Sequence, residues 1–248
     1  VRITSDPRDK LLEHQNVFYI GFGSARTFLF RTLVAKSLVM TLPDLGSFHL
    51  KRSIHPVHYF YVFHSIVSTH RIYREHAFNA YDTILCVGEH HIKEIKKTEK
   101  IYSLSKKNLE KHGYGRLDTL ISEKNKKKFL DKKIKTLPRI LIAPSWGESS
   151  IVNQLLNKLI EILIMANFNV TVRLHPMTER HYPKLSNNLK KKYEGSGNFF
   201  FDSDIASVDS LLESDIIISE WSGAAIEYAF ATERPVIFID NKLKMNNL

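Results

Sequence analysis

Apolar runs of four to six residues alternate with amphipathic stretches along almost the whole chain. The apolar runs predict buried strands over residues 17–20, 37–41, 58–63, 83–87, 139–143, 169–173, 198–201, 215–219 and 235–239. The amphipathic stretches predict helices over residues 27–35, 90–97, 151–165, 179–192, 208–212 and 223–231. Short buried strands separated by helices are typical of parallel βαβ sheets, whose ligand loops gather at the carboxyl ends of the strands.

One segment, from Ser122 to Pro138, is too highly charged to supply a core, and it ends in proline. It divides the chain into two halves that share the same α/β pattern. We therefore predict an α/β fold of two Rossmann-like, doubly wound parallel-sheet domains that face an interdomain cleft. The predicted domains cover residues 1–118 and 138–248, and residues 119–137 form a charged linker between them.

The composition excludes several kinds of protein. The 248 residues contain no run of about 18 apolar residues, so no membrane-spanning helix is predicted. The first residues lack the apolar core of a signal peptide. The single cysteine, Cys86, excludes an internal disulfide and a cysteine-based zinc site, and its apolar surroundings favour a buried core residue. We therefore expect a reducing, cytoplasmic location.

Positive charge is concentrated in one stretch of the chain. The net charge is +10, and residues 93–135 contain fifteen Lys or Arg and six Asp or Glu, a balance of +9. A solvated, helix-rich surface explains such a stretch. The alternative is a patch for an anionic partner: an acidic membrane face, a polyanionic substrate or nucleic acid. Nucleic acid is the weakest of these, because the stretch has no nucleic-acid motif and few aromatic residues.

The most informative segment runs from Asp215 to Asp240. It reads as a buried strand, a Ser/Gly-rich turn, an amphipathic helix and a second buried strand. That order places the first N–H groups of the helix, after Ser222, beside the carboxyl end of a parallel strand, where phosphates bind. Phosphate binding and an ordinary N-cap serine both explain the pattern.

Two further loops follow predicted strands in the second half. Pro144 and Trp146 could form a flat apolar wall for a nucleotide base. The strand over residues 169–173 carries Arg173 and is followed by His175, whose direction is fixed by the next residue, a proline. Together with the turn at Ser222, these loops predict one cleft at the strand ends.

In the first half, His64 follows the predicted strand over residues 58–63. It is a candidate general base because imidazole titrates near neutrality, and a strand-end histidine bonded to backbone is the alternative. His58, His64, His70 and His76 fall six residues apart. Neither a helix nor a strand brings four such positions to one point, so no metal site is predicted.

Gly21 and Gly23 follow the first predicted strand and open a helix. A dinucleotide fingerprint needs a third glycine, but Arg26 occupies that position. No acidic residue ends the next strand in the usual place. A tight turn capped by Ser24 explains the glycines, and no NAD-type cofactor is predicted.

Several short motifs follow one another along the chain. They are Pro43-Asp-Leu-Gly46, Phe63-His-Ser65, Gly113-Tyr-Gly-Arg-Leu-Asp118, Ala143-Pro-Ser-Trp146, Arg173-Leu-His-Pro176, Ser219-Glu-Trp-Ser-Gly223 and Pro235-Val-Ile-Phe238. In this order they resemble the CDP-glycerol glycerophosphotransferase family, which comprises teichoic-acid primases and polymerases and related capsule polymerases. The motifs that contain Trp146 and His175 are the most specific part of the resemblance.

The resemblance implies a GT-B fold with an acceptor-side first domain and a nucleotide-donor-binding second domain. Members of this family move glycerol phosphate from CDP-glycerol to a hydroxyl of a growing polymer at the cytoplasmic membrane face. The resemblance implies that His64 and His175 are catalytic. The residues expected to bind the donor are Arg116, Pro144, Ser145, Trp146, Arg173, Ser222 and Gly223.

This sequence departs from the family pattern at several positions. Phe63-His-Ser65 stands in place of Trp-His-Gly, and Gly115 replaces a proline. Gly223 replaces the second serine of a Ser-Ser pair, and Glu220-Trp221 replaces Asp-Tyr. The loss of the serine removes a hydroxyl donor, although a glycine N–H still reaches a phosphate. The family's final helices do not follow the last strand, so we expect a truncated second domain.

We therefore predict a transferase that moves a glycerol-phosphate or similar polyol-phosphate unit from a CDP-activated donor to a hydroxyl of a cell-surface polymer or its lipid-linked precursor. The alternatives are a GT-B glycosyltransferase that uses a sugar nucleotide in capsule or lipopolysaccharide synthesis, a basic nucleic-acid-binding module, and an inactive homologue. No resident cofactor is predicted, and Mg²⁺ is compatible with the reaction. The expected location is cytoplasmic, with peripheral contact to the anionic inner face of the membrane.

Overall fold

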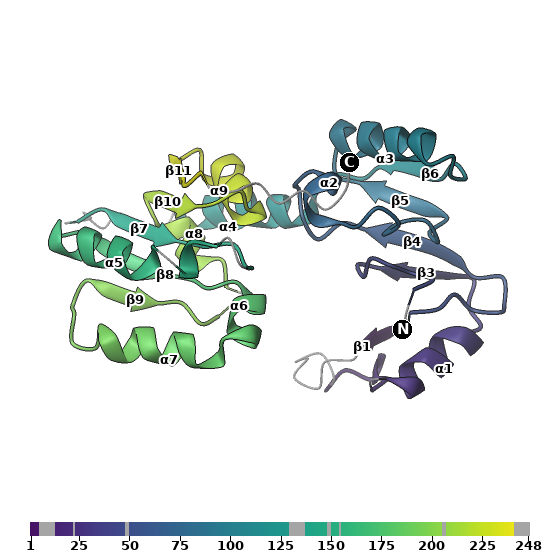
Figure 1. Cartoon of the computed structure of the whole chain (residues 1–248), viewed down its shortest axis with the longest axis horizontal. Helices are drawn as coiled ribbons and strands as arrows, with labels where there is room; N and C mark the ends of the chain where they lie inside the picture. Colours follow the sequence, from purple (N-terminus) through teal and green to yellow (C-terminus); the bar gives the residue numbers. More distant parts are fainter. Residues whose placement is uncertain are drawn as a thin grey trace. The chain divides into compact units, whose positions relative to one another are not determined.

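The computed structural model describes residues 1–4, 13–21, 23–47, 50–128, 137–147, 150–153, 155–204 and 207–240. These residues form two compact units. Unit 1 contains the described residues of 1–64 and 68–113, and unit 2 contains residues 65–67 and the described residues of 114–240. Each unit combines helices with parallel sheet, which confirms the predicted α/β class (Figure 1).

Unit 1 is built on a four-stranded parallel sheet of order β3-β4-β5-β6, with a separate parallel pair, β1-β2 (Figure 1). Its strands are β1 (Arg2–Thr4), β2 (Val17–Tyr19), β3 (Ser37–Met40), β4 (His58–Val62), β5 (Thr83–Cys86) and β6 (Asn108–Lys111). Its helices are α1 (Ser24–Thr32), α2 (Thr69–Ile72) and α3 (Glu89–Ile101). The order of the four strands follows the chain in one direction.

Aromatic side chains that alternate along β4 dominate the core of unit 1. Tyr59 and Tyr61 are fully buried, and Phe63, which follows the strand, is buried as well. The ring of Tyr61 packs edge-on against Phe63 and Tyr73. His64 follows Phe63 beyond the end of β4 and lies at the solvent-exposed border of this core, where its ring meets that of Tyr73.

Unit 2 is built on a five-stranded parallel sheet of order β11-β10-β7-β8-β9 (Figure 1). Its strands are β7 (Arg139–Ile142), β8 (Asn169–Val172), β9 (Phe199–Phe201), β10 (Ile216–Ser219) and β11 (Val236–Phe238). Its helices are α4 (Gly115–Lys128), α5 (Leu156–Met165), α6 (Pro176–His181), α7 (Pro183–Lys192), α8 (Asp209–Glu213) and α9 (Gly223–Thr232), with a 3₁₀ turn over Ile151–Asn153.

The strand order of unit 2 reverses at β7. The chain runs outward from β7 to β9 and then returns to the other side of β7 at β10. This reversal is the doubly wound arrangement that the sequence predicts. It creates a switch point between β7 and β10, where the loops after neighbouring strands diverge and leave room for a ligand.

Helices bury both faces of the unit 2 sheet. On one face, Leu141 of β7 belongs to a buried cluster with Leu120 of α4 and Tyr228 of α9. On the other face, Ile142 belongs to a cluster with Ile160 of α5. Burial on both faces explains why the strands of this sheet read as continuous apolar runs in the sequence.

The predicted linker differs from the structure. Residues 119–128 continue α4, and residues 129–136 lie outside the described residues. Leu117 and Leu120, about one helical turn apart, pack into the unit 2 core, and Lys124 and Lys127 form ion pairs with Glu233 of α9 and Asp209 of α8. The high charge of this segment therefore reflects an amphipathic helix, and the units divide after Gly113 rather than after residue 118.

The other predicted strands agree closely with the structure, whereas several helices differ: α1 lies three residues earlier than predicted, α3 extends to Ile101, and the helix predicted over 151–165 is a 3₁₀ turn followed by α5. Each predicted strand is present within about two residues of its expected ends. The predicted helix over residues 179–192 is interrupted at Pro183, which begins α7. The sequence pattern does not predict the short elements β1, β6 and α2, because β6 reads Asn-Leu-Glu-Lys and α2 has only four residues.

In the described part of the chain, no helix combines the length and the apolar composition needed to cross a bilayer. The helix α5 is apolar, but it has ten residues and lies against the unit 2 sheet.

Candidate active site

The loops after β7, β8 and β10 lie at the carboxyl edge of the unit 2 sheet, around the switch point. All seven predicted donor-binding residues and His175 belong to unit 2. Pro144, Ser145 and Trp146 follow β7, and Arg173 and His175 follow β8. Ser222 and Gly223 follow β10, Arg116 lies in the first turn of α4, and His64 belongs to unit 1.

Ser222 is the N-cap of α9, and its Oγ accepts the N–H of Ala225 at 3.3 Å. Ser219 Oγ donates its single proton to the carbonyl oxygen of Ala143 at 2.6 Å. The 2.8 Å bond between the Ser219 and Ser222 hydroxyls must therefore have Ser222 as its donor. The Ser222 hydroxyl thus fixes the start of α9 against β10, and the first N–H groups of the helix remain as the donors for an anion.

Gly223 begins α9 and lies against the segment 65–67. A Cβ at Gly223 would stand 3.1 Å from Ser65 Oγ and 3.9 Å from Glu227 Oε1. Ser65 Oγ also accepts the N–H of Val67 at 3.4 Å. The Ser65 hydroxyl therefore occupies the space that a side chain at position 223 would need, which explains the glycine at this position.

A buried carboxylate from the β10 loop fixes the β7 loop. Glu220 is 3% exposed, and its two oxygens accept the N–H groups of Ser145 at 2.6 Å and Ile151 at 2.7 Å. Ser150 Oγ donates to the Ser145 carbonyl at 2.8 Å. These bonds hold both ends of the β7 loop across the switch point, because charge-assisted hydrogen bonds are stronger than neutral ones.

Trp146 projects from this loop and is 42% exposed. Its ring stacks near two imidazoles, those of His175 at 6.1 Å and His181 at 6.3 Å between centroids. The indole therefore presents an accessible aromatic face beside His175. Such a surface suits the flat ring of a nucleotide base.

The side chain of His175 is the N-cap of α6. Its Nδ1 accepts the N–H of Met177 at 3.1 Å. A neutral imidazole has one donor and one acceptor nitrogen, so His175 carries its proton on Nε2. Pro176, at the first position of α6, begins the helix that this side chain caps.

Arg173 is held by the segment after β9. Its Nη1 donates to the Ser207 carbonyl at 3.0 Å and to Ser210 Oγ at 3.2 Å, and Asp202 Oδ2 lies 3.7 Å away. Burial lowers the pKa of the Arg173 guanidinium, while Asp202 raises it and Arg116 lowers it further. The side chain remains a cation, because no shift of this kind deprotonates arginine in a protein.

Arg116 and Tyr114 share one buried acceptor. Glu227, on α9, is 5% exposed. Its Oε1 accepts the Tyr114 hydroxyl at 2.6 Å, and its Oε2 accepts Arg116 Nε at 2.7 Å. The motif around Arg116 therefore joins the start of α4 to the first turns of α9.

His64 in unit 1 has a different environment. Burial by surrounding atoms lowers the pKa of its imidazole from an ordinary value of 6.5, and a hydrogen bond to the backbone of Thr41 opposes this effect. A bond that raises the pKa stabilises the charged ring, so the ring N–H donates to the Thr41 carbonyl. The Tyr73 ring packs edge-on against the imidazole at 6.0 Å between centroids.

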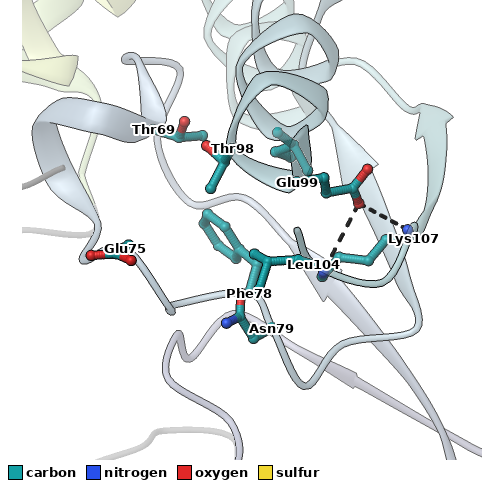
Figure 2. Close-up of a pocket in the computed structure, with 9 residues that line it drawn as sticks. Thr69, Glu75, Phe78, Asn79, Thr98, Glu99, Leu104 and Lys107 are labelled. Carbon is teal, nitrogen blue, oxygen red and sulfur yellow. Dashed lines mark hydrogen bonds and ion pairs between the residues drawn. The ribbon is translucent and has the colours of Figure 1, made fainter. Parts of the chain in front are cut away.

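Each unit also contains a cavity that is lined by other residues. In unit 1, a cavity of about 10 Å³ between α2 and α3 has room for a single water molecule (Figure 2). Glu99, in its wall, accepts the backbone N–H of Lys107 and pairs with that side chain at 3.9 Å. In unit 2, a 320 Å³ cavity lies between β8, β9 and α8, and no described residue of the β7, β8 or β10 loops lines it.

The sequence pattern does not identify two of the functional candidates, Glu220 and Glu227. Each lies in a recognisable motif or helix, but its partners are 69 to 113 residues away in the chain. The position of Glu227 four residues after Gly223 is the only local signal, because it places both residues on one face of α9. Among the described residues, no group of three or more His, Cys, Asp or Glu could hold a metal ion.

Comparison with known proteins identifies the family. The model of the family described as CDP-Glycerol:Poly(glycerophosphate) glycerophosphotransferase matches residues 65–245. This range contains every unit 2 residue described above. A comparison with curated protein sequences finds no match.

Solved structures agree in fold. The wall teichoic acid polymerase TagF matches with a TM-score of 0.64 and 16% identity over 95% of this chain and 61% of its own. A TagF variant soaked with CDPG matches with a TM-score of 0.64 and 17% identity over 96% of this chain and 60% of its own. UDP-GlcNAc 2-epimerase from Neisseria meningitidis, bound to UDP-GlcNAc, matches with a TM-score of 0.52 and 17% identity over 75% of this chain and 54% of its own. This chain thus spans less than two thirds of these polypeptides.

Proposed function

The chain belongs to the CDP-glycerol:poly(glycerophosphate) glycerophosphotransferase family, and on that premise we propose that it transfers a glycerol-phosphate or similar polyol-phosphate unit from a CDP-activated donor to a hydroxyl of a cell-surface polymer or its lipid-linked precursor. The observation that carries this proposal is the family match across the switch point of unit 2, where the serine-capped helix α9 begins and its Glu227 binds Arg116. Unit 1 supplies the acceptor side and unit 2 binds the donor.

In this proposal, the donor pyrophosphate lies at the start of α9. The first N–H groups of the helix and the positive end of its dipole bind the phosphate oxygens. Arg173 and Arg116 offset the remaining negative charge. Trp146 stacks on the cytosine ring, and Pro144 and Ser145 shape the loop that carries it. Glu220 keeps this loop in place through its two backbone bonds.

His175 acts as a hydrogen-bond donor to the donor phosphate. Its Nδ1 is occupied by the Met177 N–H, so the proton on Nε2 is the one that it offers. A neutral donor of fixed orientation stabilises charge that shifts on the phosphate oxygens in the transition state.

His64 acts as the general base. Its ring N–H is committed to the Thr41 backbone, and the lowered pKa keeps the ring neutral near pH 7. The acceptor hydroxyl loses its proton to His64 while its oxygen bonds to the β-phosphorus of the donor. The bond from that phosphorus to the bridging oxygen breaks, and CMP leaves with the electron pair.

Thermal unfolding in the presence of candidate donors tests this function. CDP-glycerol should raise the melting temperature, because a ligand at 100 times its dissociation constant adds about 2.7 kcal/mol of stability. CDP-ribitol, UDP-sugars and CMP are the comparison ligands, and CMP release with and without Mg²⁺ reports turnover. Stabilisation by a UDP-sugar but not by CDP-glycerol would contradict the proposal and favour a glycosyltransferase.

Contact with an anionic membrane surface is part of the same proposal. Lys93, Lys96, Lys97 and Lys100 are exposed along one side of α3. Each such lysine contributes about 1 kcal/mol near an anionic bilayer. Co-sedimentation with vesicles rich in phosphatidylglycerol should exceed that with phosphatidylcholine vesicles and should fall when two of these lysines become glutamine. Equal binding to both vesicles would contradict this part.

A further inference from the structure

We infer that Glu227 is a positioning residue for the donor site, which holds the guanidinium of Arg116 beside the first turn of α9. This inference rests on the proposed function and assigns a role to a carboxylate that no part of the proposed reaction uses. Glu227 lies one helical turn after Gly223, on the same face of α9. Its Oε1 lies 3.9 Å from the Cβ position at Gly223, so the carboxylate borders the proposed phosphate site.

A carboxylate at this place requires a physical reason. It is 5% exposed, and a buried negative charge near a helix N-terminus repels the phosphate that the same helix attracts. The cost of burying it is offset by two short bonds, from the Tyr114 hydroxyl and from Arg116 Nε. The carboxylate therefore neutralises part of the positive charge of the site while it fixes one cation.

Glu227 binds Arg116 through Nε and not through either Nη group. The bond at 2.7 Å is made by Nε, on one edge of the planar guanidinium. Among the described residues, no hydrogen bond is made by the two Nη groups of Arg116, and the side chain is 40% exposed. A guanidinium fixed through Nε keeps its Nη groups for the bidentate binding of a phosphate.

The electrostatic environment links the two arginines. Arg116 and Glu227 both affect the pKa of Arg173, in opposite directions. The two guanidinium groups therefore lie close enough to repel each other, and Glu227 reduces this repulsion. Without the carboxylate, Arg116 would be free to turn away from Arg173 and from the start of α9.

The variant Glu227→Gln distinguishes a role of Glu227 in positioning Arg116 from a purely electrostatic effect of its negative charge on the phosphate. Removing a negative charge beside a phosphate site should tighten donor binding if charge alone mattered. If Glu227 positions Arg116, calorimetry should show CDP-glycerol binding weakened about tenfold or more, the effect of losing one hydrogen bond to a charged group. Unchanged or tighter binding would overturn the inference.

A double-mutant cycle tests whether the effect passes through Arg116. Arg116→Gln should weaken CDP-glycerol binding by itself, and adding Glu227→Gln should cause no further loss. Additive effects would show that Glu227 acts independently of Arg116 and would refute the inference. Cytidine, which has no phosphate, provides the second readout: its affinity should stay unchanged in both variants, whereas a damaged fold would weaken both ligands.

The chain offers a matched control on the same helix pair. Glu233, at the end of α9, pairs with Lys124 of α4 at 3.2 Å and is 83% exposed. Glu233→Gln removes an α4–α9 ion pair far from the first turn and should leave CDP-glycerol binding unchanged. If Glu227→Gln does not fold, Glu227→Asp keeps the charge but shortens the reach, and wild-type affinity in that variant would overturn the inference. A wild-type protein that does not bind CDP-glycerol would instead contradict the proposed function.

Discussion

His64 and His175 both follow a buried parallel strand, one in each unit, but the backbone binds them with opposite polarity. The ring N–H of His64 donates to the Thr41 carbonyl, so the other ring nitrogen is the proton acceptor. Nδ1 of His175 accepts the Met177 N–H, so Nε2 carries the proton. One imidazole is thereby prepared to take a proton and the other to give a hydrogen bond.

This difference comes from the elements that follow each strand. After β8, Pro176 starts a helix at once, and His175 becomes the cap that binds a helical N–H. After β4, the chain continues through a loop before α2, and the His64 ring turns to the carbonyl of the residue after β3. The same residue type at equivalent strand ends thus acquires complementary chemistry from its local backbone.

Replacing His64 by glutamine should have the largest effect. The amide keeps an N–H donor for Thr41 but has no basic nitrogen, so kcat should fall by about 10²–10⁴-fold. CMP release at saturating CDP-glycerol measures the change. A His64→Gln enzyme with wild-type kcat would remove His64 from the reaction.

Replacing His175 by glutamine should have a smaller effect than replacing it by alanine. A glutamine N–H can replace the Nε2 donor, whereas alanine loses a hydrogen bond to a charged group, worth about 1.5–3 kcal/mol of transition-state stabilisation. The measurement is kcat/KM for both variants. An equal loss of kcat/KM in the two variants would argue against a role of His175 as a hydrogen-bond donor.

The pH profile of activity should distinguish the two histidines. The pKa of His64 is lowered, so the basic form persists below the ordinary value of 6.5 and activity is lost only as the pH falls further. The acid limb of kcat/KM should therefore have its midpoint below 6.5. The same limb should vanish in the residual activity of His64→Gln and persist in His175→Gln. A limb that persists after His64 is replaced would assign it to another group.

Replacing Glu220 by glutamine should give the smallest effect on the chemistry and a measurable effect on stability. The amide can accept only one of the two backbone bonds, which should lower the free energy of unfolding by about 1–3 kcal/mol. Denaturant unfolding provides the measurement. The control is Glu161→Gln, which removes an exposed pair with Lys192 and should change stability by about 0–1 kcal/mol. Equal losses in both variants would show that Glu220 does not anchor the Trp146 loop.

The local pattern of the sequence by itself determined the α/β class, the positions of nearly all strands, and which polar residues follow those strands. Apolar runs and periodicity depend on neighbouring residues, so these features can be read without knowing the fold. The predicted candidates around Trp146, His175 and Ser222 follow directly from such positions. The helix α4 was not predicted, because its lysines outnumber the two core residues Leu117 and Leu120 in that stretch.

Only the tertiary structure decided which partners these residues meet. The acceptor of Arg116 is a glutamate 111 residues away, and the acceptor of the Ser145 N–H is 75 residues away. Their encounters depend on the strand order that places β10 beside β7 and on the packing of α4 against α9. The proton position on His64 has the same cause, since Thr41 follows a different strand, whereas that on His175 is set locally by the helix that starts at Pro176.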